Sequence, residues 1–147
     1  MDSIDQEAIR ILSERGRATW AELGERLKLS PPAAAERVRK LEERGVIKGY
    51  TAVLDPETLG LSLAAFIAVT LSDHAQRQRF LEAIAEIPEI EECHHVAGDY
   101  DFLLKVRCAG TRDLDRLLTE QLKGIAGAGR THTTIVLSTQ KTNPRAL

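Results

Sequence analysis

The first thirty residues of the chain show the periodicity of short helices. Apolar residues recur at i, i+4, i+7 and i+8 from Ile4 to Leu12, which places them on one helical face, and Gly16 follows as a helix stop. Thr19 and Glu22 have the spacing of a capping box, so a second short helix is expected to begin there. The pattern therefore predicts two short amphipathic helices in this part of the chain.

A third helix is predicted over residues 31–44. Ser30 is a good N-cap, and Pro31 suits the first helical position because the N–H that it lacks would be unpaired there. The inward positions of this helix are Ala34, Val38 and Leu41, and Gly45 ends it. Two short helices joined by a tight turn, with the second one capped, indicate a helix-turn-helix.

Residues 46–54 are rich in strand-forming side chains, with Gly49 among them. A strand here, beside the third helix, would form a small wing. Asp55 and Pro56 then predict a turn. We therefore expect a winged helix-turn-helix over residues 1–54 and a linker over residues 55–62.

The remaining residues, 63–147, change period. The pattern predicts strands over 63–71, 90–97, 101–108 and 131–139, and helices over 76–87 and from 111 to about 122. The order β-α-β-β-α-β is that of a ferredoxin-like domain, so the whole chain is predicted to be α+β.

The strand predicted over residues 63–71 is apolar on both faces. Both helices of a ferredoxin-like domain cover one face of its sheet, so Phe66 has no helix to pack on. A strand that is apolar on both faces is normally buried on both. A second copy of the sheet is the simplest cover, which predicts a homodimer.

Three segments carry a family resemblance. "LSPPAAAERVRKLEERGVIKGYTAVLDPETLGL" resembles the recognition helix, wing and linker of the leucine-responsive regulator/AsnC (feast/famine) family of transcription regulators. "VAGDYDFLLKV" is similar to that family's effector-domain turn, and "GRTHTTIVLSTQK" to its last strand. The resemblance implies binding of double-stranded DNA by the N-terminal domain and of a small molecule, often an amino acid, by the C-terminal domain. It also implies dimers that assemble further, often into octamers.

The charge pattern agrees with DNA binding only locally. The net charge is −2, but residues 37–48 hold five basic residues against Glu42 and Glu43. Arg37, Lys40 and Arg44 fall at i, i+3 and i+7, a stripe off the buried face that is expected to be solvent-facing and free to meet phosphates. The alternative is an ordinary solvated helix face.

Base readout is expected to be modest, because the start of the third helix holds prolines and alanines rather than the Arg, Lys, Asn or Gln that read base edges. A larger share of the binding should then come from phosphate contacts and from DNA bending around a multimer. The candidate DNA-binding residues are Ser30, Pro32, Ala33, Glu36, Arg37, Lys40, Arg44 and Lys48.

The turn from Gly98 to Asp101 is the candidate effector site. Gly98 can expose backbone N–H groups to a carboxylate, Asp99 and Asp101 can accept from an ammonium, and Tyr100 offers a ring and a hydroxyl. The alternative is a hairpin turn with a capping aspartate. The last-strand residues that could line the same pocket are Thr131, Thr133 and Thr134. A neutral or modestly polar amino acid suits this chemistry.

Enzyme chemistry is not indicated, and neither a cofactor nor a metal site is expected. His94 and His95 are adjacent on a predicted strand and so point to opposite faces. Cys93 and Cys108 lack metal-ligand spacing and are expected to be reduced core thiols. Two alternatives stay open: a DNA-architectural protein without an effector, and an enzyme of the sirohaem decarboxylase type, which has a similar fold.

The longest apolar run, residues 61–71, is too short to span a bilayer, and no secretory signal is visible, so we expect a cytoplasmic protein with no membrane contact.

Overall fold

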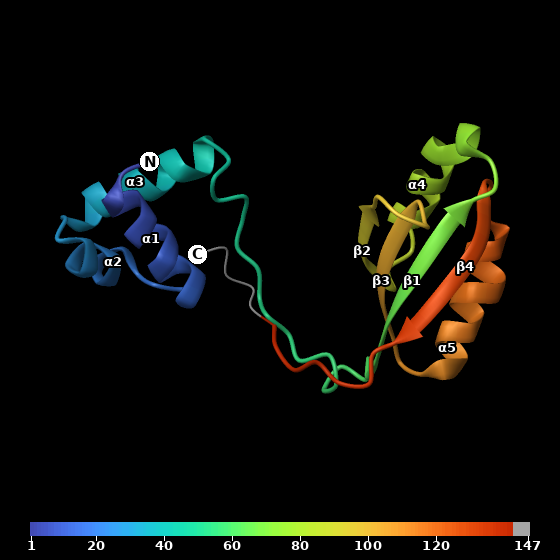
Figure 1. The fold of residues 1–147 in the computed structure, drawn as a ribbon. Helices are drawn as coiled ribbons and strands as arrows, with labels where there is room; N and C mark the ends of the chain where they lie inside the picture. Colours follow the sequence, from blue (N-terminus) through green and yellow to red (C-terminus); the bar gives the residue numbers. More distant parts are fainter. Residues whose placement is uncertain (143–147) are drawn as a thin grey trace. The chain divides into compact units, whose positions relative to one another are not determined.

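A computed structural model describes residues 1–142 and divides them into two compact units. Of these residues, the first unit comprises 1–53 and 141–142, and the second comprises 54–140 (Figure 1). Each has a hydrophobic core of its own. We describe each unit by itself.

The first unit holds three helices: α1 (Ser3–Glu14), α2 (Trp20–Leu27) and α3 (Pro31–Glu43). The predicted capping box of α2 is confirmed, because the Glu22 N–H donates to the Thr19 hydroxyl at 3.2 Å and the Glu22 carboxylate accepts the Thr19 N–H at 2.8 Å. The predicted cap of α3 is confirmed as well, since the Ser30 hydroxyl accepts the Ala33 N–H. Local sequence signals therefore set both helix starts.

A close backbone approach makes the turn between α2 and α3 tight. Lys28 adopts the left-handed conformation, and the Leu29 N–H donates to the Gly24 carbonyl at 2.8 Å. A Cβ atom on Gly24 would lie 2.7 Å from the Leu29 carbonyl oxygen and 3.2 Å from the Pro31 nitrogen. Only glycine fits there without a backbone shift, which fixes the angle at which α3 leaves the turn.

The predicted inward faces of the three helices meet in one core. Its buried members are Ala8, Ile11, Leu23, Leu27, Ala34, Val38 and Leu41. All three inward positions expected on α3 are among them, at 0–1% exposure. This core sets the face that α3 leaves outside.

The strand predicted over residues 46–54 is wrong: in the described structure, residues 44–62 contain neither helix nor strand. A strand needs a hydrogen-bonding neighbour, and the helical unit offers none. Tyr50, Val53 and Leu54 are consequently exposed. The turn expected after this segment is present, with the Asp55 carboxylate accepting the Glu57 N–H at 3.2 Å.

The second unit is the predicted β-α-β-β-α-β domain. Its elements are β1 (Leu63–Leu71), a 3-10 turn (His74–Gln76) leading into α4 (Arg77–Ala85), β2 (Ile90–His95), β3 (Phe102–Cys108), α5 (Thr111–Arg116), which continues as a π-turn (Leu117–Gln121) and a 3-10 turn (Leu122–Gly124), and β4 (Ala128–Ile135). The antiparallel sheet has the order β2-β3-β1-β4, which confirms the α+β, ferredoxin-like expectation.

The last strand lies about three residues earlier than predicted, so Leu137 falls outside it and is 97% exposed. Pairing begins early because Gly129 fits against β1, where a Cβ would meet the Thr70 carbonyl oxygen at 2.4 Å. It ends early because β1 begins at Leu63, and the Val136 N–H donating to the Ala64 carbonyl is the last rung.

Both helices lie on the same side of the sheet (Figure 1). Ala65, Ile67 and Val69 of β1 face them and are fully buried. The opposite face of the sheet, the open face, is covered by no helix of this unit, and Phe66 lies there with 39% of its surface exposed. Among residues 1–142, no helix combines the length and apolarity needed to cross a membrane.

Candidate functional site

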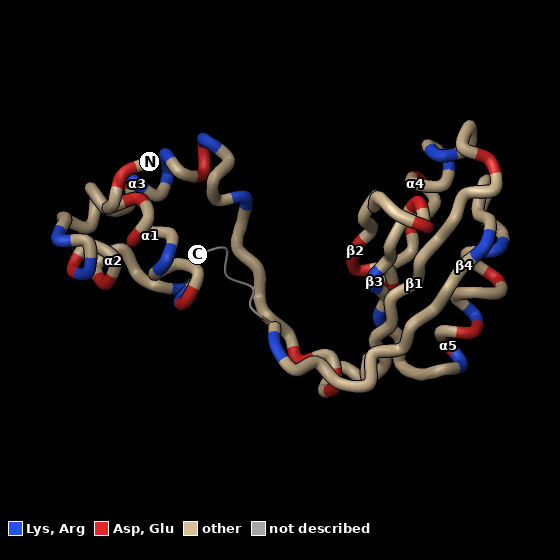
Figure 2. Tube along the Cα trace, in the orientation of Figure 1, with Lys and Arg blue, Asp and Glu red and all other residues tan. Residues whose placement is uncertain are grey.

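Two basic residues of α3 and Arg44, which caps its C-terminus, share one face, as their spacing predicted. Arg37, Lys40 and Arg44 line a hollow of about 260 Å³ together with Asp5 of α1 and Leu41. Figure 2 marks the basic residues along α3. The stripe is therefore a surface feature built on two helices rather than on α3 alone.

Arg37 is not free, which corrects the expectation of an unengaged stripe. Its Nη1 donates to the carboxylates of Asp2 and Asp5, to the latter at 2.9 Å. The side chain of Arg37 is 33% exposed and that of Asp5 only 11%. The hydrogen bond from Arg37 holds the pKa of both carboxyl groups below the ordinary value, so both are ionised at neutral pH.

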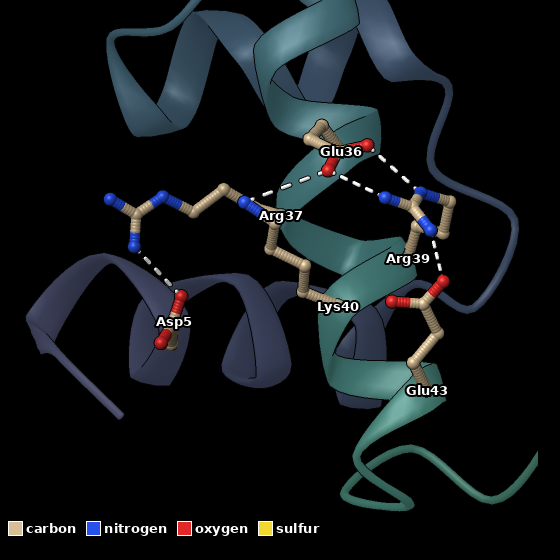
Figure 3. A network of polar contacts seen from close by, with 6 residues as sticks. All are labelled: Asp5, Glu36, Arg37, Arg39, Lys40 and Glu43. Atoms are coloured by element: carbon tan, nitrogen blue, oxygen red, sulfur yellow. Dashed lines mark hydrogen bonds and ion pairs between the residues drawn. The ribbon is translucent and has the colours of Figure 1, made fainter.

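Lys40 and Arg39 are also paired, within α3 itself. Arg39 contacts Glu36 at 2.7 Å and also contacts Glu43, and Lys40 lies 3.6 Å from Glu36 (Figure 3). These ion pairs are exposed. Exposed ion pairs contribute little to the free energy of folding, so their side chains can readily pair with other charged groups instead. In the part of the chain that the structure describes, Arg44 forms no ion pair.

Asp5 was not identified from the sequence, although one signal was present. It lies between Ile4 and Ala8 on the apolar face of α1, and a carboxylate in that position needs a cationic partner. The partner, Arg37, is 32 residues away. The periodicity of the sequence alone could not identify Arg37 as the partner of Asp5.

The start of α3 presents few polar groups. The Ser30 hydroxyl is used by the cap, Pro32 is exposed and Ala33 is half-buried. Glu36 is engaged by Arg39 and Lys40. Lys48 lies in the irregular segment after α3 and is exposed. The expectation of modest base readout stands as a prediction.

The turn at residues 98–101 combines one structural aspartate with two outward groups. The Asp101 carboxylate accepts the N–H of Leu71 in β1 at 2.7 Å, so this residue ties the turn to the neighbouring strand. Gly98 has φ +143°, and Asp99 beside it is exposed. The Tyr100 ring stacks on His132 of β4 with centroids 6.3 Å apart.

The three candidate threonines of β4 lie on both faces of the sheet, an alternation that the sequence did not assign to the pocket. Thr133 pairs with Ile67, so it lies on the helix side of the sheet, and Thr131 has the same parity. Thr134 pairs with Phe66 and lies on the open face, as does His132. The pairing thus groups Thr134 with the Tyr100–His132 stack.

The histidines of β2 diverge as expected, because His94 pairs with Leu103 and His95 with Phe102, on alternate faces. Cys108 is buried, but Cys93 is exposed, so the expectation of two core thiols is wrong for Cys93. It lies on the edge strand, where cover is incomplete. No cluster of potential metal ligands occurs within residues 1–142.

The fold and these two sites define a class of protein, a helix-turn-helix regulator with a ligand-binding domain. Residues 1–42 match the AsnC-type helix-turn-helix domain, and residues 64–146 match the Lrp/AsnC ligand binding domain. The chain belongs to the Lrp/AsnC family of DNA-binding transcription regulators.

Several named proteins resemble the chain over nearly its full length. Leucine-responsive regulatory proteins of Klebsiella pneumoniae and Escherichia coli are 40% identical to it over an alignment 147 residues long. The alignment covers 99% of this chain and 90% of each relative. A transcriptional regulator of Neisseria meningitidis, solved in complex with L-methionine, superposes with a TM-score of 0.96 at 29% identity. The match covers all of this chain and 96% of the regulator's chain. AsnC of E. coli has a TM-score of 0.90 at 26% identity, and the match covers 97% of this chain and 95% of the AsnC chain.

The family identification favours a transcription regulator over the two alternatives left open by the sequence. The relatives are named as transcription regulators, which favours a regulator over the decarboxylase-like enzyme. The matched helix-turn-helix confirms DNA binding as the function of the first unit. A family-wide ligand-binding domain favours a regulator with an effector over a purely architectural protein.

Proposed function

We propose that this chain regulates transcription by binding double-stranded DNA through α3 and by changing that binding when a free amino acid occupies the turn at residues 98–101. The observation that carries the proposal is the coverage of both units by the two family domains, in the family's order. Effector binding and DNA binding are then linked, so DNA must change the affinity for the effector by the same factor.

The proposed DNA surface is the outer face of α3 with the segment that follows it. Its residues are Ser30, Pro32, Ala33, Glu36, Arg37, Lys40, Arg44 and Lys48. The shared hollow of Arg37, Lys40 and Arg44 supports this, because clustered cations supply the phosphate contacts. The exposed pairs of Lys40 can exchange a carboxylate for a phosphate at little cost.

The proposed effector site is built on Gly98, Asp99, Tyr100 and Asp101, with Thr134 on the same sheet face and with Thr131 and Thr133 behind it. The similarity to a regulator solved with L-methionine supports an amino acid as the ligand. An amino acid needs N–H donors for its carboxylate and acceptors for its ammonium, and Asp99 is exposed and available as an acceptor. Asp101 would contribute mainly by holding the turn in place.

We further propose that the protein is a homodimer that can assemble further, with the octamer as one candidate form, and that it acts in the cytoplasm. The uncovered Phe66 supports self-association through the open face. The proposed domain boundaries are residues 1–54, 55–62 and 63–147. The family matches over residues 1–42 and 64–146 support an N-terminal and a C-terminal domain.

The test is fluorescence anisotropy on DNA from upstream of the protein's own gene, as a salt series, with and without a pool of the twenty amino acids. Salt-sensitive binding that the pool changes is expected, and dividing the pool then names the effector. Binding that ignores the pool would contradict the effector half of the proposal. An absence of binding at low salt would contradict the DNA half.

A further inference from the structure

The ion-paired Arg37 is held by one nitrogen only. Nη1 donates to both Asp2 and Asp5, whereas Nε and Nη2 have no partner within residues 1–142. In Figure 3 the bound nitrogen points down to α1 and the other edge of the guanidinium points away from it. Nε and Nη2 carry the remaining three N–H donors, and one donor from each lies side by side along that edge, in the planar geometry that matches a pair of acceptor atoms.

The two carboxylates that hold Arg37 are themselves fixed. The Asp5 N–H donates to Asp2 Oδ1 at 2.8 Å, and the Asp2 N–H donates to Asp5 Oδ2 at 3.2 Å, which is the capping box of α1. Each carboxylate therefore uses one oxygen for the helix start and the other for Arg37. The start of α1 acts as a rigid support for an arginine of α3.

This support has a consequence for binding. A free arginine loses rotamer freedom when it binds, but Arg37 has already lost much of it in the unbound protein. Lys40 and Arg44, which share its hollow, are more exposed and are not held by α1. Arg37 is therefore the preorganised member of the stripe.

We propose that Asp2 and Asp5 are positioning residues for DNA recognition, which hold Arg37 so that its Nε–Nη2 edge makes a two-point contact with acceptor atoms of DNA. The inference rests on the proposed function of α3 as the DNA-contacting helix. The acceptors are either O6 and N7 of a guanine or two phosphate oxygens. In this account, two acidic residues strengthen binding to a polyanion.

The experiment uses the full chain and a duplex selected by the wild-type protein from a random pool. Affinities are measured by anisotropy for the wild type, Asp2→Asn and Asp5→Asn. Simple electrostatics predicts tighter binding for both variants, since each removes a negative charge. Positioning predicts the opposite sign, a loss of about 5- to 50-fold, within the range of one good two-point contact.

Glu7→Gln is the matched control. It removes the same charge from α1, but Glu7 pairs with Arg10 and does not touch Arg37. We expect it to bind the duplex as tightly as the wild type, or slightly more tightly. If Asp2→Asn and Asp5→Asn behave like this control, the positioning role is wrong.

Arg37→Ala separates this inference from the proposed function. It should weaken binding at least as much as Asp5→Asn, and adding Asp5→Asn to it should change nothing further. Unchanged binding by Arg37→Ala would instead contradict the proposed DNA face. A salt slope reduced by about one would indicate phosphate oxygens, and an unchanged slope with a relaxed G·C preference would indicate guanine.

Folding is monitored by thermal unfolding followed by circular dichroism. If Asp5→Asn unfolds the helical unit, Asp2→Asn decides the question, because asparagine caps a helix about as well as aspartate. Wild-type affinity in folded Asp2→Asn would overturn the proposal.

Discussion

Phe66 offers a quantitative test of self-association. Its exposed fraction is 39% on the open face, and an aromatic side chain presents about 200 Å² when fully open, so about 80 Å² remains to be covered. At about 25 cal/mol per Å² this is worth about 2 kcal/mol per copy. A two-fold dimer contains two copies, so Phe66→Ala should weaken dimerisation by up to about 4 kcal/mol, or about 1,000-fold in the dissociation constant.

Sedimentation velocity over a concentration series measures this constant. Trp20→Ala is the control, because Trp20 is another aromatic residue of similar exposure, at 47%, in the helical unit. We expect this control to assemble like the wild type. An unchanged dissociation constant for Phe66→Ala, with circular dichroism showing a folded protein, would refute the use of the open face for assembly.

Three further predictions follow from the contacts described above. Because pairing with Arg37 lowers the pKa of Asp2 and Asp5, their contribution to stability is present above the ordinary aspartate pKa of 3.8 and is lost as pH falls through the lowered values; acid unfolding of Asp5→Asn should therefore be shallower below about pH 4 than that of the wild type. Gly24→Ala should destabilise the helical unit by about 1–3 kcal/mol in denaturant unfolding, since its Cβ would lie 2.7 Å from a carbonyl oxygen; a loss below about 0.5 kcal/mol would mean that the turn relaxes freely. Gly98→Val should abolish the amino-acid response in the anisotropy assay and cost about 1–3 kcal/mol, because φ is +143° although no atom lies within 4 Å of the new Cβ. Gly110→Val, at an extended position, is its control, and a normal response by Gly98→Val would move the effector site elsewhere.

The sequence predicted well those features that depend on neighbours in the chain. Thr19 with Glu22 and Ser30 with Pro31 mark helix starts because each cap acts over three residues. The parity of the first strand likewise identified Phe66 as uncovered. In each case the signal lies within a few neighbouring residues of one element.

Features that depend on distant partners were missed or misplaced. Residues 46–54 have strand-forming side chains, but no neighbouring strand in the unit pairs with them. The limits of β4 follow from where β1 begins and from the space that Gly129 fills. The Asp5–Arg37 pair joins residues 32 apart, and no local pattern specifies such a contact.

The irregular stretch over residues 44–62 also bears on affinity. It joins the helical unit to the sheet that carries Phe66, so a dimer formed through that sheet tethers two DNA-binding heads. Once one head is bound, the second binds at an effective local concentration set by the tether rather than by the protein in solution. The dimer then binds DNA much more tightly than a single head does. The spacing of the half-sites on DNA also helps to determine which targets are bound.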